Sequence, residues 1–221
     1  MTSDHHTARL RVNSFPEIRV RATELELWRG ELCLFDGLTF ELKQPVLHVR
    51  GANGSGKTTL LKVLCGLTST ERGEVRWSQD TESKPVSAAR GLLAYAGHQD
   101  GLNPALTVLE NLQWGAGLYH RVSAADIAHL AQAHHLENLL PLLAGSLSAG
   151  QKRRVALMRT LLTQCPVWIW DEPYANLDTA GVDWVNSLIR EHVEQGGSLI
   201  LSAHQKPDVD ASLVQSLELG Q

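Results

Sequence analysis

Several classes of protein are excluded by what this 221-residue chain lacks. It has 3 cysteines, Cys33, Cys65 and Cys165, and no C-x-x-C pair, so neither a disulfide framework nor a cysteine metal site is expected. The net charge of −4 and the pI near 6.2 give no overall basic surface of the kind that binds nucleic acid. We therefore expect reduced cysteines packed in the core and no nucleic-acid partner.

The chain also lacks a long hydrophobic run. Its longest apolar stretches, residues 139–143 and 167–170, fall far short of the roughly 18 residues that a membrane-spanning helix needs. Residues 1–17 are polar and have no apolar core, so they do not resemble a signal peptide. We expect a flexible N-terminal tail over residues 1–18 and a chain that does not cross a bilayer by itself.

A glycine-rich motif dominates what the sequence does contain. Residues 51–59, GANGSGKTT, fit the pattern G-x-x-x-x-G-K-[ST] and lie between an apolar strand at 46–49 and a predicted helix at 57–64. Glycines let successive N–H groups curl around phosphate oxygens at the positive end of the helix. Lys57 is then placed for the β- and γ-phosphates and Thr58 for Mg²⁺. The alternative is a plain glycine turn with a surface lysine.

A second candidate site follows a strand of apolar residues, 166–170, which ends in Asp171 and Glu172. In a P-loop protein the first carboxylate at this position holds Mg²⁺ and the second polarises an attacking water. The alternative interpretation is an ordinary charged end of a strand.

The order of the elements predicts a parallel sheet. Residues 92–96 form a strand that delivers Gln99 to its C-terminal end, where the ligands of parallel sheets collect. A helix over residues 180–194 leads to a buried strand at 198–202, which ends near His204. Such strand–helix–strand repeats imply right-handed crossovers between parallel strands.

An antiparallel flap is predicted on both sides of the glycine-rich motif. Residues 18–27 alternate apolar and polar side chains and indicate an edge strand, residues 32–42 indicate its partner, and residues 74–77 indicate one more strand. Trp28 or Phe35 either stacks on a nucleotide base or packs in the core of the flap.

Helical patterns occupy residues 107–143 and 152–162. The second helix begins with three cations, residues 152–154, which we expect to form a solvated face rather than a nucleic-acid patch. Ser148 and Gly150 lie at its N-terminus, where backbone N–H groups are free to bind an anion.

These segments together resemble the ATP-binding cassette (ABC) ATPases over residues 19–219. The matching parts are the Walker A loop (51–59), the Q-loop glutamine (Gln99), the signature (147–151), the Walker B strand with its glutamate (167–172), the D-loop (176–178) and the switch histidine (His204). The resemblance implies an α/β P-loop NTPase fold in one domain of residues 19–221. Its parts are a RecA-like parallel-sheet core, an antiparallel β flap and a helical subdomain at about residues 104–146. Ala149 stands at a signature position that is usually glycine.

The resemblance also implies ATP and Mg²⁺ as ligands and assigns the site residues. Glu172, which orients or deprotonates water, and His204, which contacts the γ-phosphate, are the implied catalytic residues. The implied metal ligands are Thr58, Gln99 and Asp171. The implied nucleotide-binding residues are Gly51, Ala52, Asn53, Gly54, Ser55, Gly56, Lys57, Thr58, Thr59, Gln99, Ser148, Gly150 and Asp178.

Within this family, residues 95–102, 147–157, 168–174 and 203–205 are most similar to the ATP-binding subunits of haem exporters in cytochrome c maturation. This similarity implies an integral membrane permease as partner and a second copy of the chain in an ATP-sandwich dimer. It also implies a place on the cytoplasmic face of the bacterial inner membrane. ATP hydrolysis is then coupled to the delivery or release of haem.

Other functions fit parts of the pattern. A subunit of another ABC exporter, for a lipoprotein, a lipid or a metal, shares every motif, because substrate choice resides in the membrane partner. A soluble ABC ATPase that acts on DNA or ribosomes usually carries a coiled coil, tandem cassettes or a basic surface, and this sequence has none of them. A P-loop GTP switch lacks support because no Asn-Lys-x-Asp motif occurs.

Overall fold

The structure, a computed structural model, describes residues 14–79 and 82–220. A five-stranded parallel sheet contains β3 (Val46–Arg50), β6 (Leu93–Ala96), β7 (Val167–Asp171), β8 (Ser198–Ser202) and β9 (Val214–Glu218). A four-stranded antiparallel sheet, the flap, contains β1 (Ile18–Arg29), β2 (Leu32–Glu41), β4 (Arg72–Gln79) and β5 (Glu82–Pro85). The α-helices are α1 (Lys57–Leu64), α2 (Val108–Gly117), α3 (Ala124–Ala133), α4 (Ala149–Leu162) and α5 (Thr179–Glu194). Short 3₁₀ turns are η2 (Val86–Ala88), η3 (Arg90–Leu92), η4 (Glu137–Leu139), η5 (Ala144–Ser146) and η6 (Ala211–Leu213).

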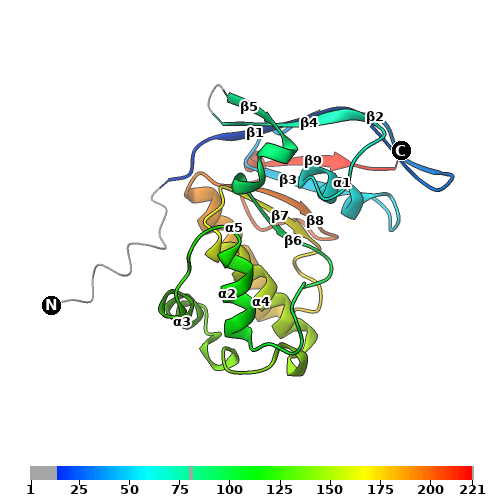
Figure 1. Cartoon of the computed structure of the whole chain (residues 1–221). Coiled ribbons are helices and arrows are strands. Elements are labelled where there is room, and N and C mark those ends of the chain that lie inside the picture. Colours follow the sequence, from blue (N-terminus) through cyan, green and yellow to red (C-terminus); the bar gives the residue numbers. More distant parts are fainter. Residues whose placement is uncertain (1–13, 80–81, 221) are drawn as a thin grey trace.

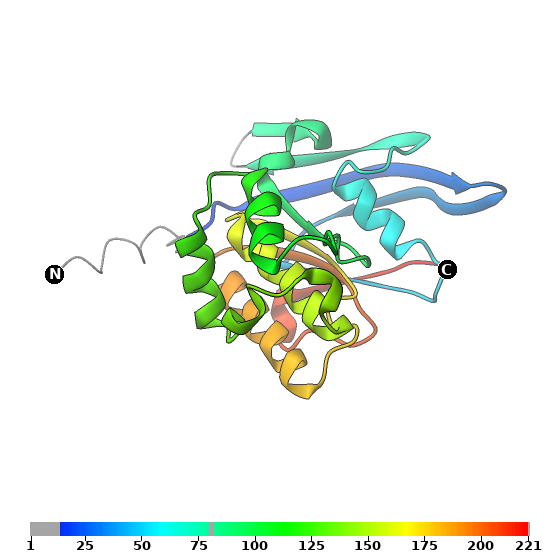
Figure 2. The ribbon, with the colours of Figure 1, turned by 60° about the horizontal axis from the view of Figure 1, so that its bottom comes forward.

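The elements form layers. In Figure 1 the flap lies above the parallel sheet, and α2, α3 and α4 lie below it. Helix α1 packs between the flap and the parallel sheet, as Figure 2 shows from a second side, and its buried leucines share one apolar core with both sheets. A second core joins the opposite face of the parallel sheet to α5. A third joins α2 and α3 to α4, so the helices between residues 104 and 146 pack around a core that α4 completes.

The predicted parallel sheet is confirmed. Its strands pair in the order β6-β7-β8-β3-β9, each parallel to its neighbour. Strands β7 and β8 are buried along their whole length, which explains their continuous apolar sequence. The last strand, β9, was not predicted, because an edge position leaves its polar residues Gln215, Ser216 and Glu218 half-buried or exposed.

The prediction of an edge strand at residues 18–27 is wrong. Strand β1 pairs with β2 on one side and with β4 on the other, so it lies inside the flap. Alternation of apolar and polar residues indicates only that one face of a strand is buried. An interior strand has the same pattern when one face of its antiparallel sheet is exposed to solvent. The burial of Val20, Ala22 and Leu25 against exposed Arg19 and Arg21 is this pattern.

The helical region also departs from its prediction in places. Residues 139–143 form no α-helix; η4 is followed by a turn in which Leu143 bridges to Thr107. Helix α4 begins at Ala149, earlier than the predicted residue 152, because the Ser148 hydroxyl accepts a hydrogen bond from the Gln151 N–H and completes a capping box.

The N-terminal segment is docked from residue 15 onward. The Phe15 N–H donates to the Gln195 carbonyl at 2.7 Å, and the Phe15 ring lies 5.0 Å from that of His192. Ile18 is already a buried residue of β1. The flexible tail predicted over residues 1–18 therefore ends earlier than residue 18, and its first 13 residues lie outside the described part of the chain.

Candidate functional site

The glycine-rich loop is shaped as an anion nest. Gly54 and Gly56 have φ angles of 85° and 93°, in the left-handed region that glycine adopts without strain. Gly51 is required for a second reason, since a Cβ there would lie 2.6 Å from the Leu219 carbonyl oxygen. The Ser55 hydroxyl is buried and has no hydrogen-bond partner in the described part of the chain. Free donors around a curled backbone at the start of α1 fit a phosphate group.

Lys57 projects over this loop. Its ammonium donates to the carbonyls of Gly51 and Ala52 at 2.8 Å and 3.0 Å. The charge is therefore held next to the nest by the loop itself, which favours the binding of an anionic group there.

Two oxygen donors meet at the end of β7. The Thr58 hydroxyl donates to Asp171 Oδ2 at 2.7 Å, and the Ser202 hydroxyl donates to Asp171 Oδ1 at 2.5 Å. Asp171 is only 1% exposed, so its carboxylate is fixed by these two hydroxyls. A hydroxyl and a carboxylate are the hard ligands that Mg²⁺ prefers, and the pair fits that ion. Ser202 was not predicted as a site residue, although its position at the end of β8 was a signal.

The next residue is held differently. Glu172 has a φ of 52°, which is uncommon for a residue other than glycine, and its N–H donates to the Ser202 carbonyl at 3.0 Å. The turn directs its carboxylate toward His204, whose Nε2 lies 3.7 Å from Glu172 Oε1. The side chain of Glu172 is 22% exposed and that of His204 is 72% exposed. One carboxylate is thus locked and its neighbour is accessible.

A buried histidine fixes the backbone next to His204. His48 of β3 is fully buried, and its Nε2 donates to the Ala203 carbonyl at 2.8 Å, next to His204. Burial lowers the pKa of His48, which favours the neutral ring. The backbone that carries His204 is thereby fixed to β3.

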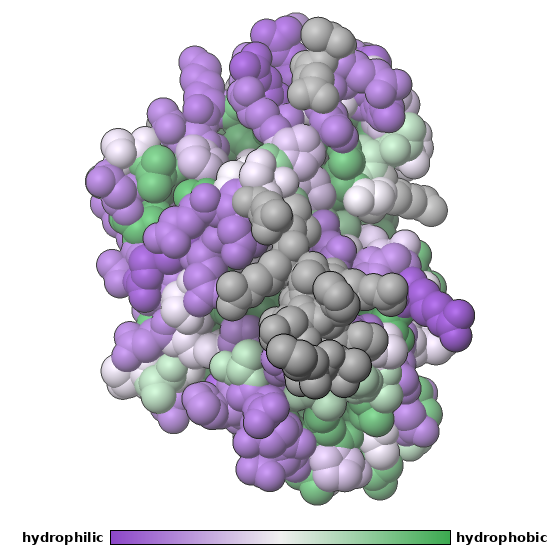
Figure 3. All heavy atoms as spheres, turned by 90° about the vertical axis from the view of Figure 1, so that its left-hand side faces the viewer, coloured by the Kyte–Doolittle hydropathy of each residue, from purple (hydrophilic) through white to green (hydrophobic). Residues whose placement is uncertain are grey.

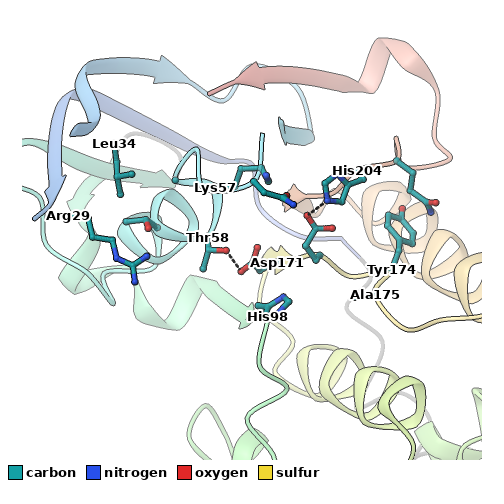
Figure 4. A pocket seen from close by; sticks show the side chains of 15 residues that line it. Arg29, Leu34, Lys57, Thr58, His98, Asp171, Tyr174, Ala175 and His204 are labelled. Carbon is teal, nitrogen blue, oxygen red and sulfur yellow. Dashed lines mark hydrogen bonds and ion pairs between the residues drawn. The ribbon is translucent and has the colours of Figure 1, made fainter. Parts of the chain in front are cut away.

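Lys57, Thr58, Asp171, Glu172 and His204 line one cavity of about 730 Å³. Figure 4 shows Thr58 and Asp171 directed toward each other near its middle, with Arg29 and Leu34 of the flap on one side. The predicted site residues that line it are Asn53, Gly54, Gly56, Lys57, Thr58, Thr59, Asp171, Glu172 and His204. The lining residues that the sequence did not indicate are Arg29, Leu34, His98, Tyr174, Ala175 and Gln205.

Neither aromatic candidate of the flap lines the cavity. Phe35 is 4% exposed and belongs to the core, where its ring would meet a Cβ at Gly56 at 3.0 Å. Trp28 is 46% exposed, and its indole N–H donates to Glu26 at 3.0 Å. The flap instead faces the cavity with Arg29 and Leu34.

Gln99 lies close to the cavity but does not line it. It is exposed in the loop that follows β6, and its neighbour His98 is the residue of that loop that borders the cavity. Its assignment as a metal ligand stays a prediction.

The expectation that Arg153 is a solvated surface cation is wrong. Arg153 is 2% exposed, and its guanidinium donates to the carbonyls of Gly97 and Asp171 and to the Asp100 carboxylate. A run of three cations at a helix start looks solvent-exposed in sequence because the loops that the second cation reaches are far away in the chain.

The remaining predicted residues lie outside this cavity. Ser148 caps α4, and Gly150 approaches so close to the Asn176 carbonyl that a Cβ there would lie 2.6 Å away. Asp178 caps α5 by accepting the Gly181 N–H at 2.8 Å. Ala149 is exposed at the first position of α4, so its methyl group meets no obstacle within the chain.

In the described ranges, 14–79 and 82–220, there is no cluster of three or more His, Cys, Asp or Glu side chains arranged to hold a metal. Within those ranges no helix has the length and apolar character to span a bilayer. On the face seen in Figure 3, hydrophilic residues cover most of the upper part, and apolar colour gathers toward the lower edge, at the level of the helices.

Comparison with known proteins decides the family. Residues 35–175 match the family model described as ABC transporter, which covers more than half of the chain. The chain belongs to the ABC transporter family. The matched range includes Lys57, Thr58, Asp171 and Glu172, which line the cavity described above. Members of this family hydrolyse ATP, and this chain is an ATPase of that type.

Several curated relatives of this ABC protein have one name in common. The cytochrome c biogenesis ATP-binding export protein CcmA of Alkalilimnicola ehrlichii is 43% identical over 193 residues, which are 84% of this chain and 80% of that protein. CcmA of Dechloromonas aromatica is 39% identical and matches 91% of this chain and 100% of its own length. CcmA of Escherichia coli strain K12 is 40% identical over 91% of this chain and 97% of its own.

Solved structures support the same fold. A dimeric bacterial ABC transporter cassette has a TM-score of 0.75 at 21% identity and covers 90% of this chain and 94% of its own. The same cassette bound to ADP and phosphate in a post-hydrolysis state also has a TM-score of 0.75, at 22% identity, over 91% and 97% of the two chains. At these identities the likeness shows the ABC cassette fold alone.

Proposed function

We propose that this chain is the ATP-hydrolysing subunit of an ABC exporter of cytochrome c biogenesis, where it energises the export of haem or its release to a carrier. The observation that supports ATP hydrolysis most directly is the meeting of Lys57, Thr58, Asp171, Glu172 and His204 in one cavity. The export role is supported by relatives named CcmA that match this chain over nearly their whole length.

The phosphates of ATP bind at the glycine-rich loop. Backbone N–H groups of residues 51–59 and the start of α1 donate to them, and Lys57 adds its charge beside the β- and γ-phosphates. Thr58 and Asp171 would hold Mg²⁺, with Gln99 as a further ligand from the loop after β6. When bound, the ion neutralises charge that develops on the phosphate oxygens.

Hydrolysis depends on the accessible carboxylate. Glu172 accepts a proton from, or orients, the water that attacks the γ-phosphate, while Asp171 keeps its two hydroxyl partners. His204, close to Glu172 at the same rim, contacts the γ-phosphate. The two adjacent carboxylates thus have separate roles.

Residues outside the cavity act on a second copy of the chain. Neither Ser148 nor Gly150, at the N-terminus of α4, lines the cavity at the chain's own glycine-rich loop. In an ATP-sandwich dimer this N-terminus donates to the partner's nucleotide, and Asp178 connects the two sites. ATP is then part of the interface, and its hydrolysis loosens the dimer.

The membrane partner is a CcmB-like integral permease, and this chain binds it at the cytoplasmic face of the bacterial inner membrane. The permease supplies the path for haem, since the described chain carries no spanning helix of its own. No nucleic-acid partner is expected from a chain of net charge −4.

The experiment that tests the export role is deletion of the gene for this chain, followed by haem staining of c-type cytochromes. We expect their loss in the deletion strain, recovery with the parental chain and no recovery with Glu172→Gln at equal abundance. Normal cytochrome c levels in the deletion strain would contradict the export role and favour an exporter of another substrate.

A further inference from the structure

One buried guanidinium joins helix α4 to two separate segments of the site. Arg153 Nη1 donates to the Gly97 carbonyl at 2.7 Å and lies 3.3 Å from Asp100 Oδ1. Its Nη2 donates to the Asp171 carbonyl, and its Nε donates to the Pro173 carbonyl at 3.4 Å. The side chain is almost completely removed from solvent.

Burial of a guanidinium is costly unless its donors are satisfied, and here the planar fork meets acceptors on both sides. Burial lowers the pKa of Arg153 and the nearby Asp100 opposes that shift, which keeps the cation paired. The acceptors are not spread over the core. Gly97 and Asp100 flank Gln99, and Asp171 and Pro173 flank Glu172.

Helix α4 connects Arg153 to the signature residues at its N-terminus. Ser148, its N-cap, precedes Arg153 by five residues, or about 7.5 Å of helix. Gly150, between them, is seated on the Asn176 carbonyl of the D-loop. A second arginine of the same helix, Arg159, donates to the Gly101 carbonyl at 3.0 Å. The helix that begins at the signature is therefore fixed to the loops that carry the chain's own catalytic residues.

We propose that Arg153 is a positioning residue for ATP hydrolysis, which fixes the loop of residues 97–100 against the end of β7. Because α4 begins at the signature, Arg153 links the placement of that signature on the partner's nucleotide to the chain's own Gln99 and Glu172. Arg153 itself contacts no nucleotide. This proposal rests on the proposed function, in which the signature and Glu172 serve the two sites of a dimer.

The test compares the full chain with Arg153→Gln, Arg153→Lys and the matched variant Arg154→Gln. Arg154 is the next residue of α4, and its guanidinium donates to the His134 carbonyl at 3.2 Å and lies 4.9 Å above the Trp184 ring. Both contacts lie outside residues 97–101 and 171–175, the two segments that Arg153 joins. Three quantities are measured for each variant: kcat, the Kd for ATP, and hydrogen exchange of residues 97–101 and 171–175.

We expect Arg153→Gln to lower kcat by about 10- to 100-fold, as for a displaced catalytic group, and to raise the Kd for ATP by less than about twofold. Exchange should rise in both measured segments. Arg153→Lys keeps the charge without the fork, so its kcat should fall between the parent and the Gln variant, and it serves if the Gln variant fails to fold. Arg154→Gln should keep kcat within about twofold of the parent.

The proposal is overturned if the folded Arg153 variants keep the parental kcat, or if Arg154→Gln lowers kcat as much as they do. A parallel measurement of turnover in Lys57→Ala distinguishes failure of the ATPase assignment from failure of the positioning role of Arg153. If Lys57→Ala abolishes turnover while the Arg153 variants keep the parental kcat, the ATPase assignment stands and only the role of Arg153 fails.

Discussion

Two histidines at opposite ends of β8 show how differently the two ends of the parallel sheet are built. His204 follows the C-terminal end of β8 at the rim of the cavity, with a side chain that is 72% exposed. His192 precedes the strand, is 2% exposed and stacks on Trp168 with ring centroids 3.7 Å apart and planes 8° apart. Its Nε2 lies 3.2 Å from the Ser198 carbonyl.

The comparison separates chemistry from packing. At the cavity end the strands finish in polar groups, of which Asp171 is fixed by two hydroxyls while Glu172 and His204 remain accessible. At the other end the His192 ring is buried in a stack with Trp168, and burial lowers the pKa of His192 to about 4. We therefore expect changes at the cavity end to affect hydrolysis and changes at the His192 end to affect stability alone.

The largest effect is expected at the cavity end, for Glu172→Gln. The amide keeps the size of the side chain but removes the basic oxygen, so the ATPase rate should fall by roughly 10²- to 10⁴-fold, while ATP still binds. Steady-state phosphate release and equilibrium ATP binding measure the two quantities. A rate near that of the parent would show that Glu172 is not the base.

The next effect is a pH dependence of stability from His192. In the unfolded chain its ordinary pKa is 6.5, and in the folded chain it is about 4, so between these values the unfolded state binds more protons. The contribution of neutral His192 to the free energy of unfolding is fully present above pH 6.5. It falls by about 3 kcal/mol as the pH decreases toward 4. Urea unfolding from pH 7 to pH 4 measures it.

His192→Phe is the matched variant for this dependence, since it keeps an aromatic ring beside Trp168 and does not titrate. The parent should lose more stability than the variant on acidification, and the ATPase rate of the folded variant at pH 7 should equal that of the parent. Equal pH profiles would contradict the assignment of His192 as a ring held neutral.

A smaller effect is expected for Lys57→Ala in the isolated chain. It removes one charge-assisted contact of about 1.5–3 kcal/mol, so the Kd for ATP should rise by about 10- to 100-fold. Calorimetric titration with ATP and Mg²⁺ measures the change. An unaltered Kd would mean that the glycine-rich loop does not hold the triphosphate.

Much of the fold was predictable because local sequence carries it. The strand–loop–helix around Lys57 and the buried strands before Asp171 and His204 have continuous apolar residues bounded by glycine or charge, and their positions are confirmed. Strand β9 and the interior position of β1 were not predicted, because sheet order depends on pairings between distant segments.

The site was predictable to the same extent. Lys57, Asp171, Glu172 and His204 follow from motifs, and the cavity unites them. Arg153 was misjudged because its acceptors lie 18 and 56 residues away in the chain. The contact that the flap makes with the cavity was misjudged for a similar reason: which side chain of a twisted, bulged hairpin faces a cavity depends on register shifts that sequence does not reveal.

The central claim is that ATP is bound between two copies of this chain, and the mass of Glu172→Gln in solution tests it most directly. Light scattering should give the 24.3 kDa monomer without nucleotide and twice that mass with ATP and Mg²⁺. The dimer persists because the variant does not hydrolyse the ATP that holds the two copies together. Asp171→Asn should remain monomeric under both conditions. A mass that does not change when ATP and Mg²⁺ are added, whether monomer or dimer, would contradict the claim.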